Sequence, residues 1–280
     1  MSAKDLLEPQ LTDVKKGNSG VVTELSEEKI LSFCRDGFVH VPGVISREEA
    51  AEFREAALDA CRRMPKYSEL AVFTQILNLW RLDPKLRQLT LHPNIGATAE
   101  KLTGKPLRLW HDHLLIKQPN NQKPTEFHQD SPYEPLGNIP SHLTAWVALC
   151  DVPVERGCMT FIPGAQHLTG LPTPKLEDPA NFEIDEEYMF RICPELSWYP
   201  RVTVPLKAGD CTFHRGSTPH RAGENATTEP RVAHVIVFVD AGAIYAGGKP
   251  HPVADELGLT PGQPLGGEMF PSVREFPARR

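Results

Sequence analysis

The amino-acid sequence predicts an α+β, mainly β fold, in which the strands form a sandwich or barrel and the helices pack outside it. The first observation is order: segments with helical periodicity come before Gly104, and short apolar runs separated by Pro, Gly and Asn clusters come after it. The second is composition, because 27 prolines and 20 glycines in 280 residues favour short strands joined by turns.

Composition and charge also bound the function. The chain is 40% hydrophobic and 24% charged, close to the average of globular proteins, which excludes a disordered, fibrous or coiled-coil protein. A formal charge of −6 gives no basic surface for nucleic acid or an anionic membrane. No run approaches the roughly 20 apolar residues of a membrane span, and residues 1–25 lack a signal-peptide pattern, so we expect a cytoplasmic protein.

The chain is expected to form one domain. Residues 1–25 are polar and predict a flexible lead-in to a single domain over residues 26–280. Within it we expect a helical part over about 26–104, a strand core over about 105–240 and a C-terminal extension over about 241–280. The six cysteines are widely spaced without a C-x-x-C pair, so reduced thiols are predicted instead of disulfides or a zinc knuckle.

Helix signals define the first part of this domain. Ser46 and Glu49, three residues apart, make a capping box, and Gly104 is placed to end the last helix. The apolar run from Phe38 to Pro42 is closed by proline and predicts a short strand. The expected helices cover residues 27–35, 46–64, 83–91 and 94–102.

Six apolar runs define the strand core. Each is short and bounded by turn residues, which is typical of strands. They cover residues 107–116, 143–149, 159–162, 202–206, 211–213 and 232–239. The insertion over residues 171–200 combines an acidic run with four aromatic residues, and we expect it to form part of a lid over a pocket.

The first candidate for chemistry is the pair His128 and Asp130, at the end of a polar loop. Residues two apart in a strand point to the same side, so an imidazole and a carboxylate could share one metal ion. An H-x-D tripeptide is a weak signal by itself, and a surface turn is the alternative.

A third ligand would come from His214 or His220, far downstream. His220 is favoured because of its spacing to Arg231, which follows eleven residues later, and His214 is expected to be a packed neighbour. Two imidazoles and one carboxylate are the ligands of non-haem Fe(II) oxygenases, which keep open positions on the metal. Arg231 begins an apolar run and could aim its guanidinium, which suits a carboxylate, into the same cavity.

The set His128, Asp130, His220 and Arg231 resembles the phytanoyl-CoA dioxygenase (PhyH) family of Fe(II)/2-oxoglutarate oxygenases. The resemblance extends over roughly residues 25–240. Flanking segments that are similar to the family cover residues 36–45, 144–149 and 157–167.

This resemblance implies a double-stranded β-helix, or jelly-roll, with iron held by His128, Asp130 and His220. Arg231 would bind the distal carboxylate of 2-oxoglutarate, which is converted with dioxygen to succinate and CO2 while an unactivated carbon of the substrate is hydroxylated. The resemblance also places further cosubstrate contacts at Trp146, Gln129, His113 and Gln75. One branch of the family halogenates carbon and lacks the metal carboxylate, so the presence of Asp130 favours hydroxylation or a related oxidation.

Other polar residues are expected to be structural. Lys117 is expected to be solvated, and His234 is expected to be a hydrogen-bonded core residue. The remaining histidines predicted to lie at the surface or in turns are His40, His92, His142, His167 and His251.

Two other functions compete with an oxygenase. One is a cupin-like metal protein, such as an isomerase or a sensor without oxygen chemistry, which has no need of Arg231. The other is an inactive relative that serves as a scaffold, although all members of the triad are retained. The partner of the oxygenase would be a small metabolite, such as a natural product, an amino acid-like compound or an acyl compound. No dense basic cluster for the phosphates of coenzyme A lies near the candidate site.

Overall fold

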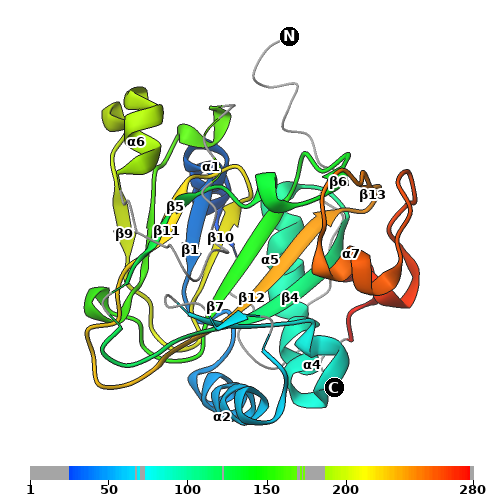
Figure 1. The fold of residues 1–280 in the computed structure, drawn as a ribbon, viewed down its shortest axis with the longest axis horizontal. Helices are drawn as coiled ribbons and strands as arrows, with labels where there is room; N and C mark the ends of the chain where they lie inside the picture. Colours follow the sequence, from blue (N-terminus) through cyan, green and yellow to red (C-terminus); the bar gives the residue numbers. More distant parts are fainter. Residues whose placement is uncertain are drawn as a thin grey trace.

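The computed structural model describes residues 25–66, 68–69, 73–121, 123–168, 171, 173 and 187–277. Apart from Leu25, the lead-in expected over residues 1–25 lies outside the described residues. The fold is a jelly-roll of antiparallel strands, as the sequence predicts (Figure 1). A seven-stranded sheet has the order β1-β10-β7-β12-β4-β3-β2, and a four-stranded sheet has the order β5-β11-β8-β9.

The strands are short, in keeping with the many prolines and glycines. Those of the larger sheet are β1 (Phe38–Val41), β2 (Ser68–Glu69), β3 (Thr74–Leu77), β4 (Leu107–Lys117), β7 (Leu143–Ala148), β10 (Cys211–Arg215) and β12 (Arg231–Asp240). Those of the smaller sheet are β5 (Thr125–His128), β8 (Met159–Phe161), β9 (Val202–Val204) and β11 (His220–Ala222). A separate pair consists of β6 (Leu136–Gly137) and β13 (Ile244–Tyr245).

The predicted helices are present with small changes of boundary. The helices are α1 (Glu27–Asp36), α2 (Arg47–Arg63), α3 (Leu79–Leu82), α4 (Pro84–Thr90), α5 (Pro93–Thr103), α6 (Tyr188–Ile192) and α7 (Pro252–Leu257). Ser46 and Glu49 form the capping box of α2, and Gly104 ends α5 with φ of 66°. In the described part of the chain, no helix is both long and apolar enough to cross a bilayer.

Two strands lie within the part that the sequence predicts to be helical. β2 and β3 extend the edge of the larger sheet beyond β4. β3 has only four residues, too few to show an alternating pattern against its surroundings, and it gains its hydrogen bonds from β4, a distant segment. Pairing that depends on a distant partner is not encoded in the local sequence.

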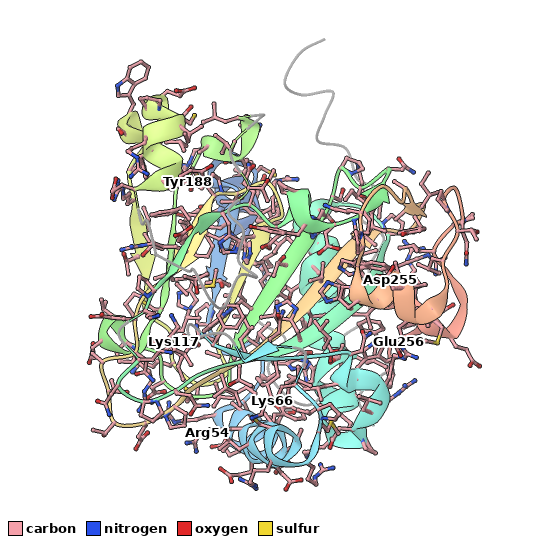
Figure 2. The ribbon with its side chains drawn as sticks, in the orientation of Figure 1. Arg54, Lys66, Lys117, Tyr188, Asp255 and Glu256 are labelled. Carbon is pink, nitrogen blue, oxygen red and sulfur yellow. The ribbon has the colours of Figure 1, made fainter. Side chains whose placement is uncertain are left out.

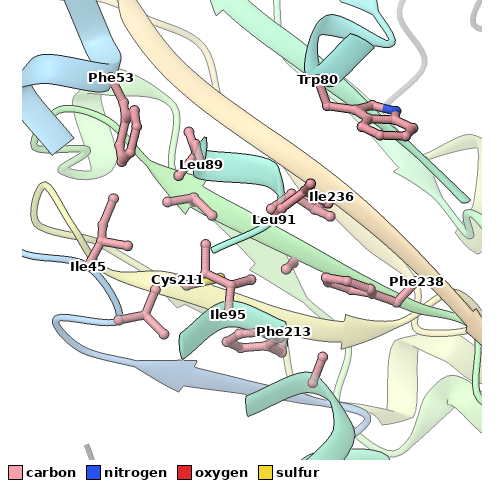
Figure 3. Close-up of a cluster of buried hydrophobic side chains, with 14 of the residues drawn as sticks. Ile45, Phe53, Trp80, Leu89, Leu91, Ile95, Cys211, Phe213, Ile236 and Phe238 are labelled. Carbon is pink, nitrogen blue, oxygen red and sulfur yellow. The ribbon is translucent and has the colours of Figure 1, made fainter. Parts of the chain in front are cut away.

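Helices cover the outer face of the larger sheet and leave its inner face to the site. Ile95 of α5 and Leu89 of α4 pack with Phe213 of β10 and Ile236 of β12 in one apolar cluster (Figure 3). Val273, in the C-terminal extension, packs in the same cluster. These contacts bury one face of each strand, so alternate residues are left to face the smaller sheet.

β12 shows this alternation most clearly. Ile236 and Phe238 belong to the outer cluster, whereas Val235 and Val237 belong to a second cluster between the sheets. Every residue of β12 is buried. The strand therefore reads as a continuous apolar run, although only its inner residues can reach a ligand.

One buried polar network crosses this outer layer. Oδ2 of Asp112 lies 3.0 Å from the backbone nitrogen of Trp80, 2.7 Å from Oγ1 of Thr90 and 3.2 Å from Nε2 of His234. Asp112, Thr90 and His234 are all fully buried. His234 is therefore the hydrogen-bonded core histidine that the sequence predicts, and the network joins α3 and α4 to the sheet.

We expect Asp112→Ala to lower the free energy of unfolding by about 3 kcal/mol, because buried donors left without an acceptor cost roughly 1–3 kcal/mol each. Asp112→Asn keeps one acceptor oxygen and should lose less. Urea unfolding followed by circular dichroism measures both values. A loss below about 1 kcal/mol for Asp112→Ala would contradict the importance of this network.

Candidate active site

The structure brings His128, Asp130 and His220 together in the smaller sheet. His128 ends β5 and pairs in register with His220, which opens the neighbouring strand β11. Nε2 of each histidine lies 3.6 Å from Oδ1 of Asp130. Asp130 itself is not in a strand, contrary to the expectation for H-x-D, but has helical dihedrals and begins a 3-10 turn. The turn still directs its carboxylate toward both imidazoles.

The orientation of both imidazoles is fixed by the backbone. Nδ1 of His128 lies 2.8 Å from the carbonyl oxygen of Glu126, and Nδ1 of His220 lies 2.9 Å from that of Thr218. A carbonyl can only accept, so each Nδ1 carries the proton and each Nε2 presents its lone pair. This tautomer is the one required of a metal-ligating histidine.

The carboxylate of Asp130 is held from the opposite sheet. Its Oδ2 accepts a hydrogen bond from Oγ1 of Thr144 on β7 at 2.7 Å and lies 3.2 Å from Nε2 of His214 on β10. Oδ1 is thereby left to face the two histidines. His214 is the packed neighbour that the sequence predicts. Its contact with Asp130, which helps to orient the carboxylate, could not be predicted from residue spacing or periodicity.

Electrostatics keep the three groups in a metal-binding state. Burial lowers the pKa of His128 and of His220 to about 4, and the proximity of another histidine adds to each shift. Burial alone would raise the pKa of Asp130, but His220 and His214 hold it well below its usual value. At neutral pH the site therefore consists of two neutral imidazoles and one carboxylate.

Two cations lie beside each other on the inner face of the larger sheet. Arg231, at the start of β12, pairs in register with Lys117 at the end of β4. Figure 2 labels Lys117. Their exposed fractions are 1% and 0%. Among the residues that the structure describes, no carboxylate makes an ion pair with either cation. The expectation that Lys117 is solvated is wrong, because the register with β12 places it inside the jelly-roll.

Backbone carbonyls provide the contacts of these cations. Nη1 of Arg231 donates to the carbonyl oxygen of Gly157 at 3.3 Å, and its Nε has no partner. Nζ of Lys117 donates to the carbonyl oxygen of Gly223 at 2.6 Å. Gly157 has φ of 77°, and a Cβ there would lie 2.6 Å from that same oxygen of Gly223, so only glycine fits.

Burial destabilises the charged form of both basic groups. It lowers the pKa of Arg231 to about 10, so the guanidinium stays charged at neutral pH. Burial and the proximity of Arg231 lower the pKa of Lys117 to about 6, against the opposing effect of Glu224, so its amine is mostly neutral at neutral pH. A buried cation without a counter-ion is costly and is stabilised when an anion binds. This end of the inner face is therefore suited to an organic anion such as a carboxylate.

The other residues expected to contact the cosubstrate are distributed along the same face. Trp146 is buried, and its ring lies 5.3 Å from the guanidinium carbon of Arg231. His113 and Gln75 occupy inner positions of β4 and β3. Nε2 of Gln129 instead donates to the carbonyl oxygen of Ser217 at 2.6 Å, which ties the H-x-D turn to the loop before His220. The cosubstrate roles of all four residues remain predictions.

Several histidines predicted to lie at the surface or in turns lie between helices and strands but are not at the surface. His92 and His142 are each 4% exposed. His92 caps α5 and His142 contacts Ser131, beside Asp130, while His251 lies near Glu134. The acidic run of the insertion over residues 171–200 lies largely outside the described residues. In the described part, Phe190 packs against Phe127 of β5, whereas Trp198 is 86% exposed.

The donor set of the triad fits a divalent transition metal. Nε2 of the two histidines and Oδ1 of Asp130 converge. In each residue the other polar atom makes a hydrogen bond elsewhere, which leaves the converging atom available to a metal. His128 and Asp130 are partly exposed, with side-chain exposures of 13% and 22%. The ligand atoms are therefore accessible from one side.

The chain is similar to several known proteins. The model of the family described as phytanoyl-CoA dioxygenase (PhyH) matches residues 33–233. The solved structure of the non-heme alpha ketoglutarate dependent carbocyclase SnoK from nogalamycin biosynthesis is 35% identical, with a TM-score of 0.79, covering 91% of this chain and 99% of that one. The epimerase SnoN, solved with Fe3+, alpha ketoglutarate and nogalamycin RO, is 37% identical, with a TM-score of 0.74, covering 89% and 98%.

A curated relative from Mus musculus is more distant. It is phytanoyl-CoA dioxygenase domain-containing protein 1, which is 26% identical over 172 residues, or 59% of this chain. The chain spans 57% of that relative's length.

We expect Thr144→Val to weaken Fe(II) binding by roughly tenfold, because removal of a hydrogen bond to a ligating carboxylate typically costs 10–100-fold in metal affinity. Thr203→Val, on the exposed edge strand β9, is the matched control and should bind Fe(II) as the wild type does. Competition with a metal chelator measures both affinities. Equal affinities in the two variants would show that Thr144 does not position Asp130.

Proposed function

We propose, because the chain belongs to the phytanoyl-CoA dioxygenase family, that it is an Fe(II)/2-oxoglutarate-dependent oxygenase acting on a small metabolite. The observation that carries this proposal is the buried guanidinium of Arg231, whose Nε has no partner, in the same jelly-roll as a triad of metal-ligand type. A metal site alone would fit many proteins. A metal site together with an uncompensated guanidinium suits a metal enzyme that also binds an organic acid.

In this proposal, His128 and His220 bind Fe(II) through Nε2 and Asp130 binds it through Oδ1. The bound iron supplies the open positions at which 2-oxoglutarate and dioxygen react. Thr144 and His214 hold the second oxygen of Asp130, so the carboxylate cannot rotate away from the histidines. These contacts fix the geometry before any ligand arrives, which limits the reorganisation needed during the reaction.

Arg231 binds the distal carboxylate of 2-oxoglutarate. Its Nε is unpartnered and its charge is uncompensated, so the incoming carboxylate supplies both a hydrogen-bond acceptor and a counter-ion. Trp146 packs against the guanidinium and excludes water from this pair. Lys117 on the neighbouring strand would take up a proton when an acid binds beside it, because a nearby anion raises the pKa of a buried lysine.

The reaction proposed is hydroxylation of an unactivated carbon, with 2-oxoglutarate converted to succinate and CO2. Asp130 occupies the position that halogenating members of the family leave for a halide, so halogenation is not proposed. SnoK and SnoN are a carbocyclase and an epimerase. Their similarity supports a natural product or related small metabolite as the substrate, and product analysis separates hydroxylation from those two outcomes.

Anaerobic addition of Fe(II) and then 2-oxoglutarate to the apoprotein should produce the weak visible charge-transfer band of a chelated keto-acid. Asp130→Ala should produce no band, because one of three metal ligands is lost. Arg231→Leu should retain Fe(II) but require roughly 100-fold more 2-oxoglutarate, since loss of one partner of a buried charge pair costs about 2–5 kcal/mol.

Two further variants control this titration. Arg231→Lys keeps the charge without the two-pronged geometry and should lie between the wild type and Arg231→Leu. Arg274→Leu removes an arginine whose side chain is 71% exposed and should match the wild type. Metal bound by the wild type without a band would favour a cupin-like protein without oxygen chemistry. Loss of iron from Arg231→Leu would show that Arg231 has another role.

A metabolite that stimulates succinate release should yield a product with one additional oxygen atom. Mass spectrometry of reactions under isotopically labelled dioxygen should find the label in the product, because hydroxylation transfers one oxygen atom from dioxygen. The variant Asp130→Ala is the inactive control. A product that is two hydrogens lighter, or isomeric with the substrate, would exclude hydroxylation and identify ring closure or epimerisation.

A further inference from the structure

A second group of two histidines and one carboxylate lies outside the triad. It consists of His111 on β4, Glu134 between the 3-10 turn and β6, and His251, which precedes α7. Nε2 of His111 is 3.4 Å from Oε1 of Glu134, and Nε2 of His251 is 3.4 Å from Oε2. One ligand atom from each residue lies within 4.8 Å of the other two.

The group is buried and carries a negative charge. The side chains of His111, Glu134 and His251 are 6%, 7% and 11% exposed. Burial alone would raise the pKa of Glu134, but the hydrogen bond with His111 and the neighbouring imidazoles lower it to about 2. Burial lowers the pKa of His251 to about 4. In the parts of the chain with described coordinates, no lysine or arginine forms an ion pair with this carboxylate.

Hydrogen bonding within the group is weak. At 3.4 Å, both nitrogen–oxygen distances exceed the 2.7–3.2 Å of ordinary N–H···O bonds. Nδ1 of His111 and Nδ1 of His251 are buried without a partner. These are not the Nε2 atoms that face Glu134, so neither imidazole is held by a second hydrogen bond, although nearly all buried polar groups in proteins are satisfied.

We propose that His111, Glu134 and His251 bind a second divalent metal ion of the zinc class, separate from the triad. Two ligands at about 2.0–2.1 Å from a tetrahedral ion are roughly 3.4 Å apart. His111 lies at this distance from Oε1 of Glu134 and His251 from Oε2, so an ion between the imidazoles would use both oxygens or require a small rotation of the carboxylate. Imidazole nitrogen and carboxylate oxygen are ligands of zinc, and three protein ligands leave the fourth position for water. The ion would also supply the positive charge that Glu134 lacks.

The ligands come from three separate segments, which gives the ion a structural role. β4 belongs to the wall of the jelly-roll, Glu134 follows the turn that begins at Asp130, and His251 belongs to the C-terminal extension. Trp110 stacks on His251 at 5.2 Å and donates to Oε2 of Glu134 at 2.5 Å. A bound ion would therefore join α7 and the turn after Asp130 to the sheet.

This site is distinct from the triad although both face the same interior. His111 pairs with Val237 of β12, which in turn pairs with Thr144, the residue that holds Asp130. β12 thus lies between the strand that carries His111 and the strand that carries Thr144, although Glu134 follows Asp130 by only four residues. The proposal concerns metal content and stability, and it does not depend on the oxygenase function.

Metal counting tests the proposal. The full chain would be stripped with a chelator, reloaded with Zn(II), dialysed and measured by inductively coupled plasma mass spectrometry. We expect two equivalents in the wild type and one in the triad double variant His128→Ala/His220→Ala. Glu134→Gln and His251→Asn should each retain one equivalent, and Glu134→Gln combined with the triad double variant should retain none.

Circular dichroism establishes that each variant is folded. His251→Asn lies on a partly exposed segment and still tests the site if Glu134→Gln does not fold.

Thermal unfolding supplies an independent readout. Zn(II) should raise the melting temperature of the triad double variant by several degrees, because an ion bound only to the folded state stabilises it. The shift should vanish when Glu134→Gln is added and persist with Glu268→Gln, an exposed glutamate in the same extension. One equivalent in the wild type and none in the triad double variant would overturn the second site and leave the triad intact. A triad double variant that keeps every ion of the wild type would instead overturn the triad.

Discussion

The carboxylate of Asp130 is the interaction on which the site depends, because it joins the two sheets of the jelly-roll. From the smaller sheet, Nε2 of His128 and of His220 approach Oδ1. From the larger sheet, Thr144 and His214 contact Oδ2. A carboxylate contacted from both sides cannot rotate without losing contacts to one sheet. The helices that bury the outer face of the larger sheet thus also support the geometry of the site.

Uncompensated charge is the second constraint. Arg231 and Lys117 are buried next to each other, and their contacts in the described residues are to backbone carbonyls. Two of those carbonyls belong to segments that approach each other closely at Gly157, where a Cβ would lie 2.6 Å from the carbonyl oxygen of Gly223. The fold therefore maintains a buried guanidinium at a cost in stability that an acidic ligand can offset. Such a cost is typical of a binding site and unusual for a region that serves structure alone.

Polar residues gather on the inner face to an extent that composition does not suggest. His111, His113, His214 and Thr144 all point between the sheets from neighbouring strands. The C-terminal extension completes this region by bringing His251 beside Glu134, which follows Asp130 by only four residues. The interior thus combines these polar groups with an apolar cluster that includes Val235 and Val237, and a ligand or ion would satisfy polar atoms that lack a partner.

The sequence by itself determined the fold class, the capped helices, most of the strands and the grouping of His128, Asp130 and His220. These features are local in sequence or belong to motifs with fixed spacing. The tertiary structure alone decided that Lys117 is buried, that Thr144 and His214 hold Asp130, and that His111, Glu134 and His251 meet. The reason is strand register, since one residue of shift moves a side chain from one face of a sheet to the other. Register is set by pairing between distant segments, which a single sequence does not reveal.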